Sequence, residues 1–158
     1  MNTGEMIETF AIAQAMRDHA WLYPAVSIAH IVGFSILVGS VVMFDLRVLG
    51  LSKAIPVRAL ARLLLPWSVG SLALIVPTGL VLFAAHADDF LDDRVFAAKM
   101  GLILAAGINA AMFLTGPYQT VKAWDTGMKA PLLARLSAAL SIALWIGVVS
   151  CGRIIARP

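Results

Sequence analysis

Four long apolar stretches dominate this chain of 158 residues. They cover about residues 22–44, 66–85, 95–116 and 136–152, and each is bounded by charged or helix-breaking residues. A helix needs about 20 residues to cross the hydrocarbon of a bilayer, and a backbone in lipid must satisfy its own hydrogen bonds. We therefore expect an all-α integral membrane protein, with a single membrane domain over residues 1–158 built as a four-helix bundle.

The composition excludes several classes of protein. Hydrophobic residues make up 61% of the chain and charged residues 13%, whereas a soluble domain is about half apolar and about a quarter charged. A single cysteine excludes disulfide frameworks and multi-cysteine metal sites. No nucleophile, base and orienting group can be named together, which favours a protein without catalytic activity of its own.

The segment of about residues 3–18 is less apolar than the rest. Glu5 and Glu8 stand where a secretory signal would carry basic residues, so we expect this segment to remain in the mature chain. Its apolar residues recur at helical spacing: Met6, Ile7, Phe10 and Ala13. We expect a short amphipathic helix that lies on the membrane surface.

The positions of lysine and arginine between the stretches predict the orientation. Most lie after the first and third stretches: Arg47, Lys53, Arg58, Arg62, Lys122, Lys129 and Arg135. The other side holds Arg17, Arg94, Arg153 and Arg157. We expect the first group in the cytoplasm and both termini in the periplasm, in a bacterial inner membrane. Basic residues near anionic lipid explain the net charge of +3, so we expect the bilayer as a partner and no nucleic acid.

Small and polar residues indicate which helix faces pack together. One stripe of the first stretch carries Ser27, His30, Gly33, Leu37 and Ser40. Two further pairs of small residues are Ala106 with Ala110 and Ser137 with Ser141. Asn109 is expected to hydrogen-bond a neighbouring helix. In the second stretch Pro77 removes a backbone donor and is expected to bend the helix, unless Thr78 repairs the hydrogen bonding.

His30 is the most informative polar residue within a stretch. A polar side chain is costly to insert into a membrane and usually faces the bundle interior. Imidazole binds haem iron and other metals, and bundle cores commonly hold such cofactors. One interpretation makes His30 an axial ligand of haem b or a metal ligand. The other makes it a packing histidine that is hydrogen-bonded to the next helix, and both stay open.

Two residues are candidate second ligands. A rise of about 1.5 Å per residue places Met100 at a depth similar to that of His30. The same arithmetic places His86 at the rim, about 10 Å from the depth of His30, so that pair needs the bend at Pro77 to meet. The plainer interpretation of Met100 is a side chain that fills the core.

Charged residues near the helix ends suggest two further sites. Lys99 and Arg153 form a candidate anion-binding corner for haem propionates or a quinone-like head group. The plainer interpretation is that Lys99 reaches to the head groups or pairs with Asp92 or Asp93. At the outer surface, one set of residues suits copper, zinc or calcium: His19, His86, Asp88, Asp89, Asp92 and Asp93. A solvated acidic loop is the simpler expectation there.

Asp45 and Arg47 lie at the other end of the first stretch. Residues two apart on a helix cannot face each other. We expect these two to join a network of surface charges with Lys53, Arg58 or Arg62.

Several short runs resemble a known family. They are W-L-Y-P (Trp21 to Pro24), H-I-V-G (His30 to Gly33), D-L-R-V-L-G-L (Asp45 to Leu51), P-W (Pro66, Trp67), F-A-A-K (Phe96 to Lys99), I-N (Ile108, Asn109), L-W-I-G (Leu144 to Gly147) and G-R-I-I-A (Gly152 to Ala156). Over nearly its whole length the chain resembles an uncharacterised bacterial family of short four-helix inner-membrane proteins, a domain of unknown function. The resemblance implies the architecture and brings no established activity. More distantly, the chain is similar to copper-resistance membrane domains and small cytochrome b-like bundles, which place histidines in similar helices.

Three functions remain open from the sequence. The first is a small protein that binds haem b or a metal and passes electrons to another membrane or periplasmic redox protein. The second is a structural or assembly subunit of a larger membrane complex, in which His30 and Asn109 hold the helices in register. The third is an accessory to transport of a small solute or metal, with a hinge at Pro77 and a homo-oligomer to complete the path.

Overall fold

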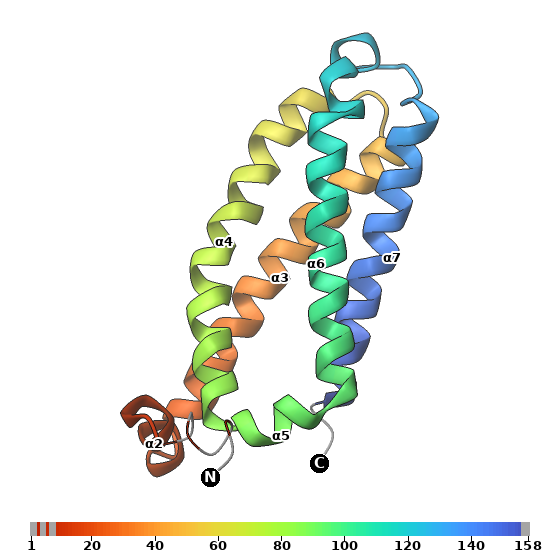
Figure 1. Ribbon diagram of the computed structural model, residues 1–158. Helices are drawn as coiled ribbons and strands as arrows, with labels where there is room; N and C mark the ends of the chain where they lie inside the picture. Colours follow the sequence, from red (N-terminus) through yellow and green to blue (C-terminus); the bar gives the residue numbers. More distant parts are fainter. Residues whose placement is uncertain (1–2, 4–5, 7–8, 156–158) are drawn as a thin grey trace.

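The computed structural model describes residues 3, 6 and 9–155. Its four long helices are α3 (Leu22–Leu49), α4 (Val57–Ala85), α6 (Arg94–Thr115) and α7 (Leu132–Ile155) (Figure 1). Shorter elements are α2 (Ala11–Asp18), α5 (Ala87–Asp92) and the 3-10 helix η1 (Pro117–Ala123). The described residues contain no strand, and all four long helices are long and apolar enough to cross a membrane. The chain is therefore a multi-pass membrane protein built as a four-helix bundle.

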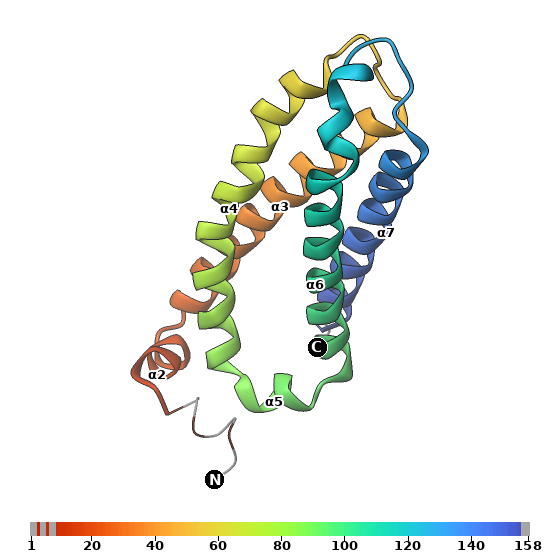
Figure 2. The same cartoon turned by 45° about the horizontal axis from the view of Figure 1, so that its top comes forward.

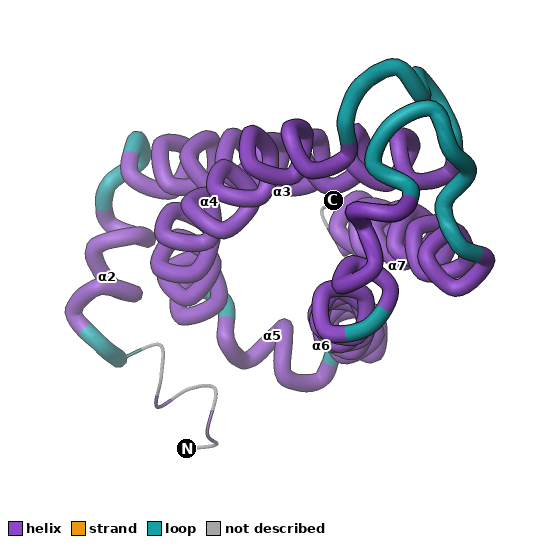
Figure 3. The backbone as a smooth tube through the Cα atoms, turned by 90° about the horizontal axis from the view of Figure 1, so that it is seen from above, coloured by secondary structure: helices purple, strands orange, loops and turns teal. Residues whose placement is uncertain are grey.

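The bundle consists of two helix pairs. α3 packs against α4, α6 packs against α7, and the pairs meet where α3 contacts α7. α3 runs diagonally across the bundle, and α4 stands apart from α6 at the end where α5 connects them (Figures 1 and 2). Seen along the bundle, α5 bridges the two pairs (Figure 3). We call this end the α5 end, and the opposite end, with the α3–α4 loop and η1, the loop end.

The hydrophobic core lies at the loop end. Its buried residues come from all four long helices and from the connection between α6 and α7: Phe44, Val48, Val57, Ala61, Phe113, Val121, Trp124, Ala130, Ala134 and Ala138. The rings of Phe44 and Phe113 meet edge to face, with centroids 5.7 Å apart. The helices are therefore held together most firmly at the loop end.

The sequence predicts that the small-residue stripe of α3 packs inside the bundle, and three of its residues do so. Gly33, Leu37 and Ser40 are buried. A Cβ atom on Gly33 would lie 3.0 Å from Cγ1 of Ile75 on α4, which is closer than side-chain atoms normally approach. The absence of a side chain at Gly33 therefore sets how closely the two helices pack.

Asn109 links α6 to α7, which confirms its predicted role. Its Nδ2 donates to the carbonyl oxygen of Ser137 at 3.0 Å, and the Ser137 hydroxyl donates to Oδ1 of Asn109 at 2.9 Å. Ala106 is buried on the same side, but Ala110 is exposed. The prediction for Ala110 is therefore wrong, because the face of α6 toward α7 carries Asn109 beside Ser137 and Leu102 beside Gly147.

Three helices are longer than the predicted stretches. α4 begins at Val57 rather than near residue 66, and it continues through Pro66. Its first turn is held by the opposite loop, since the Val57 amide donates to the Asp125 carbonyl oxygen at 3.0 Å and the Arg58 amide to Oδ1 of Asp125 at 2.8 Å. α3 continues past 44 to Leu49, and α7 exceeds 136–152 at both ends. Hydropathy marks the lipid-facing part of a helix, whereas its hydrogen bonding continues into polar surroundings.

α2 is the described part of the predicted surface helix over 3–18. Glu5, Ile7, Glu8 and Arg157, which were named above, lie outside the described residues. α2 buries Ala13 and Met16 and packs against α4 and α3, whereas Phe10 of the predicted apolar stripe is exposed. Part of the apolar face of α2 therefore packs against the bundle.

Candidate functional site

His30 lies in the α5 half of the bundle, where α3 packs against α4. Its ring is half-buried, and its Nδ1 lies 3.0 Å from Oγ1 of Thr78 on α4. A Cβ atom on Gly79 would lie 3.1 Å from Cε1 of His30. Gly79 therefore leaves the space in which the imidazole lies directly against the backbone of α4.

The hydrogen bonds of Thr78 determine which nitrogen of His30 carries the proton. Thr78 donates its single hydroxyl proton to the carbonyl oxygen of Leu74 at 2.5 Å, so its Oγ1 accepts from the ring. From this geometry we assign the proton to Nδ1, which leaves the lone pair on Nε2.

Pro77 precedes Thr78 inside α4. Proline lacks the N–H that would continue the helical ladder, and the Thr78 hydroxyl lies within 3.2 Å of the Ile75 carbonyl oxygen as well as bonding Leu74. α4 remains continuous but changes direction along its length (Figure 1). The sequence predicts a bend at Pro77. The Thr78 hydroxyl does not replace the missing donor, because Pro77 leaves the carbonyl group of Ala73 without its N–H, whereas Thr78 bonds Leu74 and Ile75.

Lys99 of α6 is the charged residue whose field reaches His30. Its side chain is half-buried, and its Nζ lies 3.9 Å from where a Cβ of Gly152 on α7 would be. In the described part of the chain, Lys99 forms no ion pair with Asp92 or Asp93. Asp93 instead accepts a backbone N–H in the first turn of α6 at 2.7 Å. Lys99 therefore turns into the bundle rather than toward the loop carboxylates.

Met100 and Arg153, the other candidates near this depth, face outward. Met100 is the next residue after Lys99 and is 41% exposed. Arg153 is exposed at the end of α7, and no described contact joins it to Lys99. The structure thus brings His30, Thr78 and Lys99 to one region and leaves Met100 and Arg153 outside it.

His86 lies between α4 and α5, away from His30. Its ring meets that of Tyr23 edge to face, with centroids 5.4 Å apart, and that of Phe90 at 6.4 Å. Tyr23 precedes His30 by seven residues, which is about 10 Å along a helix. The bend in α4 therefore does not bring the two histidines to one depth.

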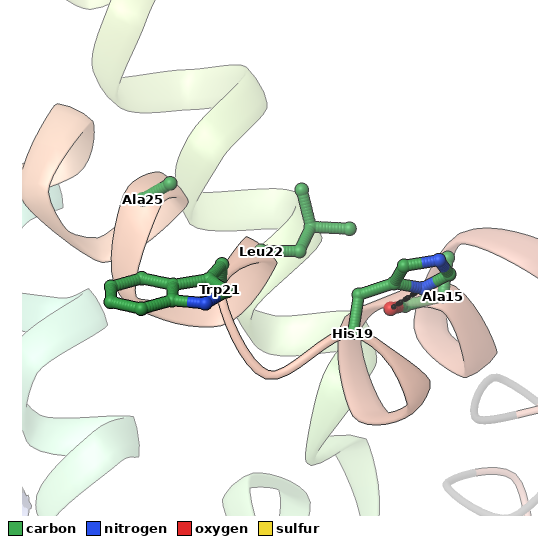
Figure 4. Close-up of a pocket in the computed structure, with 5 residues that line it drawn as sticks. All are labelled: Ala15, His19, Trp21, Leu22 and Ala25. Carbon is green, nitrogen blue, oxygen red and sulfur yellow. Dashed lines mark hydrogen bonds between the residues drawn. The ribbon is translucent and has the colours of Figure 1, made fainter.

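His19 is separate from both. Its Nδ1 lies 3.1 Å from the Ala15 carbonyl oxygen beside a hollow between α2 and α3, which Leu22 and Ala25 also line (Figure 4). Trp21 lies in the connection between α2 and α3 and is 85% exposed, as expected of a residue at a membrane interface. Among the described residues, no three His, Cys, Asp or Glu side chains gather closely enough to hold a metal ion.

Arg47 has a structural role that the sequence did not indicate. It is 3% exposed, and its guanidinium donates to the carbonyl oxygens of Ile55 at 2.6 Å, Lys53 at 3.2 Å and Asp125 at 3.0 Å. Arg47 thereby ties the α3–α4 loop to the segment after η1. The predicted network of surface charges is wrong for this residue, because its partners are backbone carbonyl groups.

Asp45 is also buried, and the same prediction is wrong for it. Only 7% of the residue is exposed, and among the described residues its Oδ2 finds no hydrogen-bond partner. The hydroxyl of Ser141 on α7 is its hydrogen-bonding neighbour. Asp45 thus lies in the interface between α3 and α7 rather than at the surface.

Comparison with known proteins identifies the family to which the chain is similar. The model of a family described as a family of unknown function (DUF6644) matches residues 5–157. No curated protein and no solved structure matches the chain. The matched range includes every helix described above.

Proposed function

The chain belongs to the family of unknown function DUF6644. We propose that it is an inner-membrane protein that binds haem b through His30 for electron transfer. The observation that carries the proposal is the hydrogen bond from His30 Nδ1 to Thr78. That bond leaves the Nε2 lone pair free, which is the form of imidazole that binds haem iron.

The surroundings of His30 fit such a group chemically. An acceptor on the second ring nitrogen fixes the orientation of a ligating histidine, and Thr78 supplies it. Lys99 supplies a positive charge in the same region, which suits a haem propionate. α4 and α6 do not pack extensively against each other. A planar group beside His30 would therefore displace few contacts between these two helices. When bound, haem supplies the one-electron redox chemistry.

His30 would be the one residue of this chain that holds the haem iron. Met100 faces outward and His86 packs against Tyr23, so neither is proposed as the second ligand. Their replacement is expected to leave a haem spectrum unchanged, whereas replacement of His30 is expected to remove it.

An orientation and a partner belong to the same proposal. Basic residues are concentrated at the loop end, which the distribution of lysine and arginine assigns to the cytoplasm. His30 and Lys99 then lie toward the periplasmic side, where another membrane or periplasmic redox protein exchanges electrons with the haem. This orientation is tested with a single cysteine introduced at Gly127 or at Asp89 in a Cys151→Ser chain. The measurement is the reaction of that cysteine with a membrane-impermeant maleimide.

The proposed function is tested by visible spectroscopy of detergent-purified protein from cells supplied with a haem precursor. We expect a Soret band, an α-band that sharpens on reduction with dithionite, and about one haem per chain. A flat spectrum, with neither iron nor copper by elemental analysis, contradicts the proposal. His19→Ala is the matched control for His30→Ala, because His19 lies at the surface by α2.

A second function is supported by the exposure of α6. Only Ala106 and Phe113 of this helix are buried, and its main partners are α7 and η1. An assembly subunit would place a partner helix along the remaining face. Native mass spectrometry from a mild detergent tests this alternative, since it predicts a stoichiometric partner that Gly107→Trp removes and Gly70→Trp on α4 does not.

A further inference from the structure

Asp45 is a buried carboxyl group whose surroundings contain no partner for one of its oxygens. It is 7% exposed, and Oδ2 accepts no hydrogen bond in the described structure. Ser141, itself 8% exposed, is the side chain that reaches it from α7. An ionised carboxylate in such a place loses its hydration and gains only one hydroxyl in return.

Among the side chains that the structure describes, no basic residue forms an ion pair with Asp45. Arg47 is two residues away, but its guanidinium is turned to the loop carbonyl groups of Lys53, Ile55 and Asp125. Lys53, in the α3–α4 loop, is half-buried. The other basic residues near this end are exposed: Arg58, Arg62, Lys122, Lys129 and Arg135. Asp125, the other carboxylate at the loop end, caps the first turn of α4.

The position of Asp45 gives it access to one side of the membrane. It lies four residues before the end of α3 at Leu49, which is about 6 Å along the helix axis. A group that is buried but close to one aqueous surface can exchange a small ligand with that side only. A carboxyl oxygen without a donor, next to one hydroxyl, has the chemistry to bind a proton.

We propose that Asp45 is a proton-binding site within the bundle, which exchanges its proton with the solution at the loop end and uses Ser141 as its hydrogen-bonding partner. This site is independent of His30, because it lies near the opposite end of α3 and between different helices. It adds a protonatable group to the membrane interior whether or not the protein binds haem.

Infrared difference spectroscopy of the purified full-length chain tests the proposal. The carbonyl stretch of a protonated carboxylic acid is absent from an ionised carboxylate and shifts in D2O. The difference between wild type and Asp45→Asn at pH 7 is expected to contain one such band. The matched control Asp89→Asn, at an exposed position on α5, is expected to show only ionised carboxylate bands.

Two further arms identify the bound species and the site. Ser141→Ala is expected to move the acid band to higher frequency, because the hydrogen bond from the hydroxyl is lost, and this arm remains informative if Asp45→Asn does not fold. Replacement of choline chloride in the buffer by sodium chloride is expected to leave the acid band in place. Ionised carboxylate bands in the Asp45→Asn difference, an acid band unmoved by Ser141→Ala, or loss of the band in sodium would each overturn the proposal.

Discussion

Nδ1 of His30 donates to Oγ1 of Thr78 across the contact between α3 and α4, at 3.0 Å. Thr78 can accept this bond because its own proton goes to the Leu74 carbonyl oxygen of the proline-containing turn. The bend in α4 and the tautomer of His30 are therefore parts of one local arrangement. Pro77 and Gly79 on either side of Thr78 belong to it as well, the first by removing a donor and the second by making room for the ring.

Thr78 is accordingly expected to act as a positioning residue for the haem ligand. Thr78→Val keeps the shape but removes the acceptor, and we expect haemin to bind about 10-fold to 100-fold more weakly, the usual cost of losing such a partner. Thr78→Ser restores the hydroxyl and is expected to bind as the wild type does. Haemin titration of the apoprotein measures both, and equal affinities for Val and Ser variants would contradict this role.

Gly79 provides a more local test of the same packing. In Gly79→Ala the new methyl group would lie 3.1 Å from Cε1 of His30, so the ring must move. We expect a shifted Soret band and weaker haem binding. Gly70→Ala on the same helix has no atom within 4 Å of its new methyl group. Both variants gain the same helix propensity, about 1 kcal/mol, so a difference between their spectra reports the contact with His30 alone.

The pair of hydrogen bonds between Asn109 and Ser137 is expected to stabilise the contact of α6 with α7. A double-mutant cycle with Asn109→Ala and Ser137→Ala reports the hydroxyl bond alone, because the carbonyl group of residue 137 remains in alanine. It should give a coupling free energy of about 0.6 to 2 kcal/mol, the range found for such bonds in membranes. Unfolding in mixed micelles measures it. Ser150→Ala is the control, because the Ser150 hydroxyl bonds a carbonyl group of its own helix. A coupling near zero would show that the two side chains do not act together.

Arg47 is expected to be the most important single polar residue for stability at the loop end. Arg47→Met leaves three backbone carbonyl groups without their charged donor, and we expect a loss of about 3 kcal/mol in the free energy of unfolding. Arg47→Lys keeps the charge but not the fork of donors, so it is expected to recover only part of this loss. Arg62→Met, at an exposed position on α4, should change stability by less than about 0.5 kcal/mol. Equal effects at the two arginines would contradict the role of Arg47.

The number of helices and the packing face of α3 could be predicted because they depend on local patterns. Hydropathy marks each span, and the spacing of Gly33, Leu37 and Ser40 marks one face of a helix. Asn109 could be predicted for the same reason, since a polar side chain in a span must find a partner.

The directions of the single charged side chains could not be predicted, because they depend on residues far away in the sequence. Arg47 bonds a carbonyl group of Asp125, 78 residues later. The rise per residue predicts that Met100 and His30 lie at similar depths in the membrane, but it does not determine which residue of α6 faces the interior. Lys99 takes that position, and Met100 points to the lipid side.

The most direct test of the central claim is the reduced visible spectrum of His30→Gly, recorded without and with added imidazole. Removal of the side chain leaves space beside Thr78 for a free imidazole, which can replace the missing ligand. We expect the haem bands to be lost in this variant and restored by imidazole, whereas His86→Gly keeps the wild-type spectrum without it. A His30→Gly protein whose haem bands equal those of the wild type, or a wild-type protein that binds no haem, would contradict the account.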